Sequence, residues 1–149
     1  KLIENYKKSS TGVTLGGTYV WGSNMNVAND GMLLLMASKV LGDTSYVDYA
    51  EDQLIYILGR NPVSYCYVTG YGSQTPENPH HRPSEVLGKA MPGMLVGGAD
   101  GNLEDPYAKA VLAKLPKERC YVDNAQSYSC NEVTIYWNSP LIYLLDGLN

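Results

Sequence analysis

The chain has 149 residues, of which 44% are apolar and 17% charged, so it is long enough to bury the core of an ordinary domain. Its net charge of -4 and pI near 5 argue against nucleic acid as a partner, because such a surface needs clustered Lys and Arg. No apolar run reaches the ~18 residues that a membrane-spanning helix requires. We therefore expect neither nucleic acid nor a membrane as a partner.

Two helices are predicted in the first forty residues. Residues 1–8 have the pattern of the end of an amphipathic helix. Residues 27–41 are apolar on most sides, which is typical of a helix buried between two layers rather than one lying on a surface. Gly42 follows as a stop signal, because glycine commonly ends a helix in the left-handed conformation.

A third helix follows directly in the sequence. Thr44 or Ser45 can cap it, and apolar residues then recur at spacings of three and four as far as Gly59. This spacing matches the period of an α-helix with one buried face. The polar residues of the same stretch are predicted to face water: Asp48, Glu51, Asp52 and Gln53.

Residues 61–101 are rich in Gly and Pro, which excludes a long helix or a central strand. Loops of this length inside a compact domain are usually functional or disordered. Several Tyr and the run His80-His81-Arg82 favour a functional loop. Planar rings stack on the apolar face of a pyranose, and a guanidinium group hydrogen-bonds its hydroxyls. The alternative is that this run forms an ordinary solvated turn.

The C-terminal third is predicted to contain two further helices joined by extended chain. A short helix is expected over 107–115. Residues 132–137 alternate between apolar and polar, which favours an extended segment with Glu132 on the polar side. Asn138 or Ser139 would then cap a final helix, with the following proline in its first turn.

Two carboxyls, two phenols and one amide gather just before this final segment: Tyr121, Asp123, Tyr128, Asn131 and Glu132. A carboxylic acid can protonate a glycosidic oxygen only if its surroundings keep it neutral near the working pH, and aromatic neighbours that desolvate such an acid raise its pKa. Glu132 is therefore the candidate acid of a sugar-processing site. The alternative is that both carboxylates cap a loop or pair with an Arg, as most carboxylates do.

The fixed spacing of residues in 121–139 resembles the C-terminal active-site signature of glycoside hydrolase family 9, the inverting cellulases. Residues 67–72 together with 79–82 resemble the other signature of that family. Two positions in this loop, Cys66 and Gln74, depart from the usual pattern of the family.

The likeness is colinear along most of the chain, from about Tyr19 to Leu145, and includes 21–24 and 57–62. It implies an all-α fold, the C-terminal portion of an (α/α)6 barrel with long active-site loops. We expect residues 1–149 to be one segment of a single catalytic domain whose N-terminal part is absent, since the chain begins with Lys1 and has no secretory leader. The resemblance also implies an extracellular location.

The resemblance implies hydrolysis of β-1,4-glucosidic bonds in cellulose or a related β-glucan, with inversion. Glu132 would be the general acid, and Asp123 would support it by holding Tyr or backbone donors. The water-activating base would come from the N-terminal part of the domain, so this chain alone is expected to be inactive. The substrate-binding residues implied are His80, His81, Arg82 and Tyr128.

No cofactor is required for this chemistry. Calcium is common in the family, and the candidate ligands are Asp100, Asn102 and Asp105; this is not an EF-hand, which would need Glu where Val111 stands. Zinc is not supported, because the three Cys are scattered and the only two His are adjacent.

Two alternatives stay open from the sequence. The chain could be a noncatalytic carbohydrate-binding or structural helical fragment, or part of another (α/α)6 carbohydrate enzyme such as a lyase. The glucan and the endo or exo mode are also undetermined. An odd number of Cys leaves at least one thiol unpaired within the chain, and pairing of Cys120 with Cys130 remains undecided.

Overall fold

The computed structural model describes residues 1–149 and is helical, without strands. Extended segments meet only at isolated β-bridges. The prediction of an all-α fold is confirmed. In chain order the helices are α1 (Leu2–Lys8), α2 (Ser23–Leu41), α3 (Ser45–Ile57), α4 (Arg82–Leu87), α5 (Pro106–Leu112), the 3₁₀-helix η1 (Lys117–Arg119), α6 (Tyr128–Asn131) and α7 (Ile135–Gly147).

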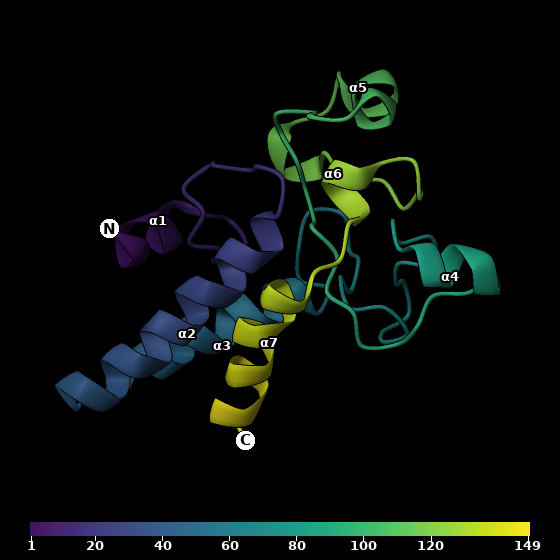
Figure 1. Ribbon diagram of the computed structural model, residues 1–149. Coiled ribbons are helices and arrows are strands. Elements are labelled where there is room, and N and C mark those ends of the chain that lie inside the picture. Colours follow the sequence, from purple (N-terminus) through teal and green to yellow (C-terminus); the bar gives the residue numbers. More distant parts are fainter.

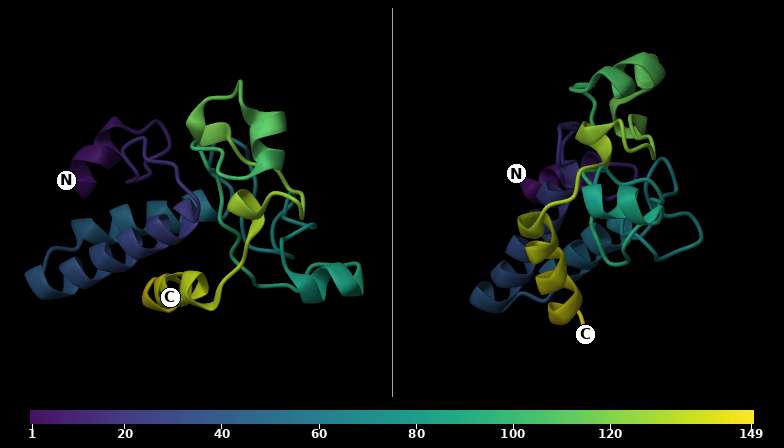
Figure 2. Two further views of the ribbon diagram at one scale, coloured as in Figure 1. Left: turned by 45° about the horizontal axis from the view of Figure 1, so that its top comes forward. Right: turned by 45° about the vertical axis from the view of Figure 1, so that its right-hand side comes forward.

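Helices α2, α3 and α7 pack together, with α2 contacting both of the others (Figure 1). The turned views in Figure 2 keep α2 and α3 side by side. Gly31 of α2 lies where the three helices meet: a Cβ there would come within 2.9 Å of the Leu144 methyls and 3.2 Å of Gln53 Cβ. The absence of a side chain at Gly31 thus permits the close packing of the three helices. Burial of each surrounding leucine stabilises the fold by about 1.5–3 kcal/mol.

The first three predicted helices are present. Helix α2 begins at Ser23, four residues before the predicted start at Val27, and Gly42 ends it in the left-handed conformation with φ 65°. Helix α3 follows Thr44, whose side chain makes no capping bond. Instead an Asp43 carboxylate oxygen accepts from the Ser45 backbone N–H at 2.9 Å.

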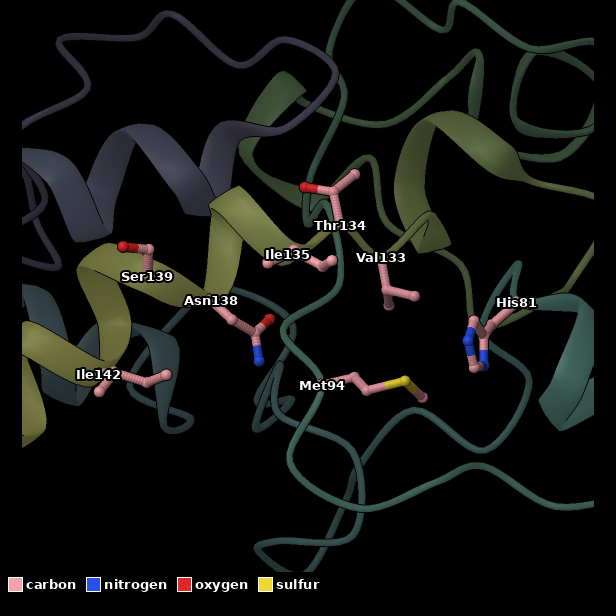
Figure 3. Close-up of a pocket in the computed structure, with 8 residues that line it drawn as sticks. All are labelled: His81, Met94, Val133, Thr134, Ile135, Asn138, Ser139 and Ile142. Atoms are coloured by element: carbon pink, nitrogen blue, oxygen red, sulfur yellow. The ribbon is translucent and has the colours of Figure 1, made fainter.

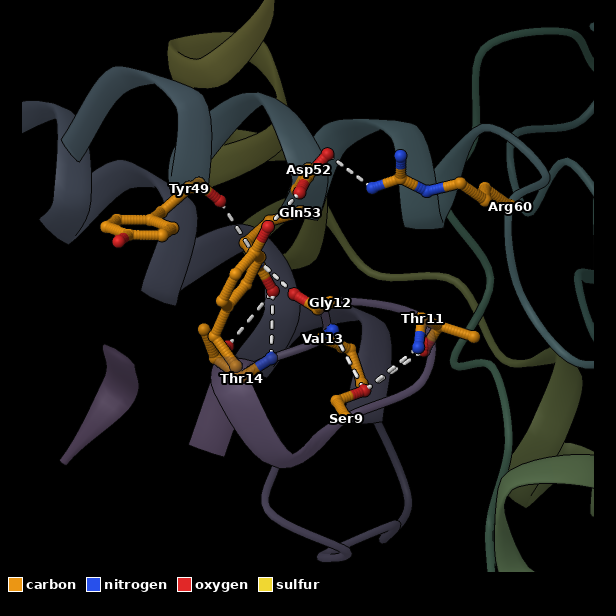
Figure 4. A network of polar contacts seen from close by, with 10 residues as sticks. Ser9, Thr11, Gly12, Val13, Thr14, Tyr49, Asp52, Gln53 and Arg60 are labelled. Atoms are coloured by element: carbon orange, nitrogen blue, oxygen red, sulfur yellow. Dashed lines mark hydrogen bonds and ion pairs between the residues drawn. The ribbon is translucent and has the colours of Figure 1, made fainter. Parts of the chain in front are cut away.

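Gln53 does not face water, contrary to the prediction. Its side chain is fully buried, and its amide oxygen accepts from the Thr14 backbone N–H at 3.0 Å and from the Thr14 hydroxyl at 3.1 Å. Its amide nitrogen donates to the Gly12 and Tyr49 carbonyls, both at 2.9 Å (Figure 4). The helical period places Gln53 at the edge of the apolar face of α3, where residues 12–14 cover it. Burial is tolerated because the side-chain amide both accepts and donates, and so satisfies N–H and C=O groups of that segment.

The long loop between α3 and α5 contains no strand and no long helix, as predicted, but it does contain the short helix α4. Antiparallel bridges join Val68 to Leu95 and Val96 to Val133. The loop backbone is thereby tied both to itself and to the segment before α7. Much of this loop is buried, including Tyr67 and Leu95, so it forms part of the core.

The C-terminal segment differs from its prediction. Extended chain stops at Thr134, whose hydroxyl accepts from the Trp137 backbone N–H at 3.3 Å, so α7 begins at Ile135 and Pro140 lies inside it. The prediction of extended chain over 132–137 was wrong beyond Thr134. Thr134 is a good N-cap, and tertiary packing decides the conformation of so short a stretch. The four-residue helix α6 was also not predicted, and α5 ends at Leu112 rather than 115. No helix has both the length and the apolar character needed to cross a membrane.

Candidate active site

Glu132 lies in extended backbone between α6 and α7, and neighbouring segments pin that backbone on both sides. Its N–H donates to the Tyr128 carbonyl at 3.0 Å, and its own carbonyl accepts from the Gly97 N–H at 3.1 Å. A parallel bridge pairs it with His80. The backbone position from which the Glu132 side chain projects is therefore fixed by main-chain contacts with three parts of the chain.

The Glu132 carboxylate has a single hydrogen bond within the chain. The Trp21 indole N–H donates to Oε2 at 3.0 Å, and Oε1 accepts none. The Trp21 ring packs against Tyr128, with centroids 5.1 Å apart, and the His80 ring lies 6.0 Å from that of Tyr128. Three segments far apart in the sequence thus bring Trp21, His80, Tyr128 and Glu132 together; we call these four residues the Glu132 cluster.

His80 is exposed, and its ring is oriented by the loop before α6. Its backbone N–H donates to the Asn131 carbonyl at 2.8 Å, and its ring Nδ1 lies 2.6 Å from the Ala125 carbonyl. A carbonyl can only accept, so Nδ1 carries the proton. In the neutral ring, Nε2 is then left as an acceptor without a partner in the chain.

Asp123 is occupied by donors from the chain itself. One oxygen accepts from the Asn78 N–H at 3.0 Å and the Asn131 side-chain amide at 2.9 Å. The other accepts from the Glu77 N–H at 2.8 Å and the Asn78 side-chain amide at 3.2 Å. The carboxylate thereby fastens the loop that leads into His80 to the residue before Glu132.

Asn131 connects this arrangement to the core. It is fully buried, and its amide oxygen accepts from the Tyr121 hydroxyl at 2.7 Å, while its amide nitrogen donates to Asp123 and to the Asn78 carbonyl at 3.1 Å. Burial, and then the Asp123 charge, raise the pKa of Tyr121 well above its usual value. Tyr121 therefore stays a neutral donor to Asn131 rather than to Asp123.

Two of the predicted substrate-binding residues, Arg82 and His81, form no hydrogen bond with the Glu132 cluster. Arg82 is exposed at the start of α4 and makes no ion pair. His81 lines a pocket of about 460 Å³ beside α7, and its Nδ1 lies 2.9 Å from the Ser84 hydroxyl. The other lining residues, labelled in Figure 3, are Met94, Val133, Thr134, Ile135, Asn138, Ser139 and Ile142. This pocket contains neither Glu132 nor its three companions.

Comparison with known proteins settles the family. Residues 2–145 match the family model of glycosyl hydrolase family 9. The chain belongs to this family.

Two relatives illustrate the extent of the match. The cellodextrinase of Butyrivibrio fibrisolvens is 38% identical over 99% of this chain. Endoglucanase D of Acetivibrio thermocellus is 36% identical over 98% of it. The chain spans 28% of the former and 21% of the latter, so it corresponds to roughly a quarter of these family 9 proteins.

Solved structures agree in fold. A single-mutant thermostable endoglucanase from Alicyclobacillus acidocaldarius superimposes with a TM-score of 0.88 at 36% identity, over 99% of this chain and 28% of that one. A complex of AaCel9A with cellobiose-like isofagomine gives 0.90 at 36% identity, over 97% and 28%. The helices and loops described above therefore form part of an (α/α)6 barrel of the family 9 type.

The predicted calcium ligands are engaged elsewhere. Buried Asp100 accepts from the Asn102 N–H at 3.0 Å and the Glu104 N–H at 2.7 Å, which shapes its own turn. Asp105 caps α5, as described below. No group of three His, Cys, Asp or Glu side chains converges anywhere in the chain. These donors do not fit the six to eight oxygen ligands that calcium prefers.

Asp105, like Asp123, is a carboxylate with four hydrogen bonds from the chain. It accepts from the Ala108 N–H at 2.7 Å, from the Ser127 hydroxyl at 2.8 Å, and from the Ser129 hydroxyl at 2.6 Å and N–H at 3.2 Å. Burial alone would raise the pKa of Asp105, but the bonds from Ser129, Ala108 and Ser127 outweigh it, so the pKa lies below its usual value. Asp105 joins α5 to α6 as a charged acceptor.

All three cysteines are free and buried, so Cys120 and Cys130 are not bridged. The Cys130 thiol donates to the Cys120 carbonyl at 3.5 Å, and the Cys120 thiol points to the carbonyl of Pro116 at 3.4 Å. Burial raises the pKa of each thiol. They pack as small apolar side chains in this family 9 segment.

Sequence reasoning assigned no role to two residues of the site. Trp21 was noticed only as part of a motif resembling the family, although its indole contacts Glu132. Glu104 accepts from the Trp21 backbone N–H at 3.1 Å. A separation of 111 residues between Trp21 and Glu132, and of 83 between Trp21 and Glu104, leaves no local signal in a single sequence.

Proposed function

We propose that this chain supplies the general acid and part of the substrate cleft of a family 9 catalytic domain that hydrolyses β-1,4-glucosidic bonds. Glu132 would protonate the leaving glycosidic oxygen. The remaining part of the domain, N-terminal to this segment, would supply the base and the other side of the cleft. The substrate would be cellulose or a related β-glucan.

The arrangement of Glu132 carries this proposal. Its backbone is pinned by main-chain bonds to Tyr128 and Gly97, and one carboxylate oxygen has no partner in the chain. A structural carboxylate would have its oxygens filled, as those of Asp123 are. A fixed side chain with an open oxygen is what proton donation to a bound substrate requires.

An inverting mechanism needs a second carboxylate that activates water on the far side of the sugar, roughly 6.5–9.5 Å away. Asp123 is poorly suited to that task, because four N–H donors already occupy it and would have to be given up. Its contacts favour the supporting role, through backbone and amide donors. We therefore propose inversion with a base from outside these 149 residues.

The surroundings of Glu132 suit a sugar ring. Tyr128 and Trp21 offer ring faces beside the acid, and His80 presents an unpaired ring nitrogen that can accept from a hydroxyl. Arg82 would reach the substrate from α4 in the assembled cleft, and His81 lies with the separate pocket. The names of the relatives, cellodextrinase and endoglucanase, support a β-1,4-glucan.

A polymeric glucan cannot enter a cell, so we propose that the complete protein acts outside it. Hydrolysis by a general acid and a base needs no cofactor.

The test is the release of reducing ends from amorphous cellulose, with insoluble xylan as a control polymer. Three samples are compared: this chain alone, the chain mixed with the N-terminal remainder of its domain, and the complete domain. Activity of the mixture and the complete domain, but not of the chain, supports the proposal. Activity of the chain alone would place a base within it, and an inactive but folded complete domain would favour a noncatalytic carbohydrate-binding role.

A further inference from the structure

Trp21 is the side chain in direct contact with the Glu132 carboxylate. Its indole N–H donates to Oε2 at 3.0 Å, and no other donor in the chain reaches that carboxylate. Trp21 lies in the turn two residues before α2, far from Glu132 in sequence. Its orientation therefore decides how the Glu132 carboxylate is turned.

Several contacts hold Trp21 in place. Its backbone N–H donates to Glu104 Oε2 at 3.1 Å, and its ring packs on Tyr128 with an interplanar angle of 44°. Around it the Ser23 hydroxyl accepts from the Val20 N–H at 2.8 Å and donates to the Val20 carbonyl at 2.7 Å, closing a tight turn.

Gly22 completes that turn in the left-handed conformation, with φ 83°. A Cβ at Gly22 would lie 3.1 Å from the ring of buried Trp137, so this position also needs a residue without a side chain. The turn thus packs against the first helical turns of α7, the helix that follows Glu132 in the sequence. The donor and the carboxylate are therefore anchored to the same part of the fold.

We infer that Trp21 is a positioning residue for the general acid: its N–H holds Oε2 of Glu132 so that Oε1 carries the proton toward the glycosidic oxygen. This inference rests on the function proposed above. In the step, the Oε1–H bond breaks and the proton goes to the leaving oxygen as the glycosidic C–O bond breaks, while a water that loses its proton to the base outside this chain bonds to the anomeric carbon. Glu132 is left as a carboxylate.

The bond to Oε2 strengthens during that step. An N–H donated to a carboxylate is roughly twice as strong as one donated to a neutral acid, so Trp21 stabilises the developing charge more than the protonated ground state. Its removal should therefore lower kcat more than it raises KM. From the usual contribution of a hydrogen bond to a charged group, the expected loss is about 10–100-fold in kcat.

The experiment uses Trp21→Phe in the complete catalytic domain, since Phe keeps an aromatic ring and removes the N–H. A second variant replaces the indole N–H by sulfur, with benzothienylalanine at position 21, which keeps the size of the ring. Both are assayed on cellotetraose and on an aryl cellobioside with a dinitrophenol leaving group, which departs without a proton. A merely structural or stacking role would affect the two substrates alike.

The expected result is a 10–100-fold lower kcat on cellotetraose, a KM within about twofold, and little change on the aryl cellobioside. In addition, Trp21→Phe should cause no further loss on cellotetraose in a Glu132→Gln background, because the residue acts through Glu132. Parent-like kcat in both variants, equal losses on both substrates, or additive losses in the double variant would each overturn the inference. If the parent domain cleaves no β-glucan, the proposed function fails and this inference fails with it.

Discussion

The helix layer and the loop face of this chain are held together by different forces. By helix layer we mean α2, α3 and α7, whose contacts are made by buried apolar side chains around Gly31. By loop face we mean residues 58–134, where side-chain acceptors, chiefly buried Asp105 and Asn131 and partly buried Asp123, bind backbone, hydroxyl and amide donors. The helix layer could tolerate other apolar residues of similar volume, whereas each acceptor of the loop face has a defined set of partners.

The same comparison separates the carboxylates by role. Asp105 and Asp123 each accept four hydrogen bonds from the chain, and Glu132 accepts one. A filled carboxylate stabilises the fold, and an open one is available to a ligand. Removal of the open carboxylate should therefore lower the catalytic rate, and removal of a filled one should lower the free energy of unfolding.

The largest effect is expected for Glu132→Gln in the complete domain. Loss of the proton donor should lower kcat/KM on cellulose by about 10²–10⁴-fold, with binding to cellulose and the melting temperature nearly unchanged. Kinetics, cellulose pull-down and thermal unfolding check this. Activity within a few-fold of the parent would reject Glu132 as the acid.

Asp105→Ala should show the opposite pattern. It removes the cap of α5 and leaves two buried serine hydroxyls without their acceptor, so the free energy of unfolding should fall by about 3 kcal/mol. Urea denaturation of the complete domain measures the loss. Glu104→Ala, at the exposed neighbouring carboxylate, is a matched control for stability and should cost less than about 1 kcal/mol. Equal losses in the two variants would contradict the assignment.

The pH dependence of stability should also trace to Asp105. Because its pKa in the folded state lies below the unfolded value, its contribution is present above the unfolded pKa, near 3.9, and is lost as the pH falls through the lower folded pKa. Asp105→Asn should therefore flatten the acid limb of the stability curve below about pH 4. Thermal unfolding between pH 2 and pH 6, run on both proteins, tests it; identical acid limbs would refute it.

A smaller effect on catalysis is expected for Arg82→Lys. The charge is kept but the planar fork is lost, so kcat/KM on cellulose should fall about tenfold with stability unchanged. Exposed Arg60, already paired with Asp52, offers a control substitution to Lys remote from the site. An unchanged kcat/KM for Arg82→Lys would remove Arg82 from the substrate cleft.

The smallest effect is expected for Tyr56→Phe at the boundary between the two regions. The Tyr56 hydroxyl is buried without a hydrogen-bond partner, and burial raises its pKa well above the usual value. Its removal should leave the free energy of unfolding within about 1 kcal/mol of the parent, or raise it slightly. A loss of several kcal/mol in urea denaturation would show that the hydroxyl has a partner.

The contrast between the two regions also explains which parts could be predicted from the sequence. Helices α2 and α3 were found because their apolar periodicity and Gly42 are local signals. The start of α7 was predicted too late in the sequence. Thr134 caps the helix through its hydroxyl, and packing rather than local sequence decides whether this cap forms. Gln53 was assigned to water because its partners lie some forty residues away, at 12–14.

The candidate site shows the same division. Glu132, Asp123, His80 and Tyr128 could be chosen because chemical type and motif spacing lie within the sequence itself. Their roles in the enzyme remain predictions. The indole of Trp21 could not be assigned to the carboxylate, because that contact depends on how the turn before α2 is wedged against Trp137. Pairwise contacts across 111 residues are a property of the fold.

The three free thiols have a practical consequence for how this segment reaches its folded state. No covalent cross-link joins the turns of the loop face, so their order comes entirely from hydrogen bonds and packing. Folding therefore requires no oxidant and no disulfide isomerase, and a reducing agent should leave the thermal stability of these residues unchanged. The segment is thereby suited to production in a reducing cytoplasm, where many secreted proteins with structural disulfides fail to mature.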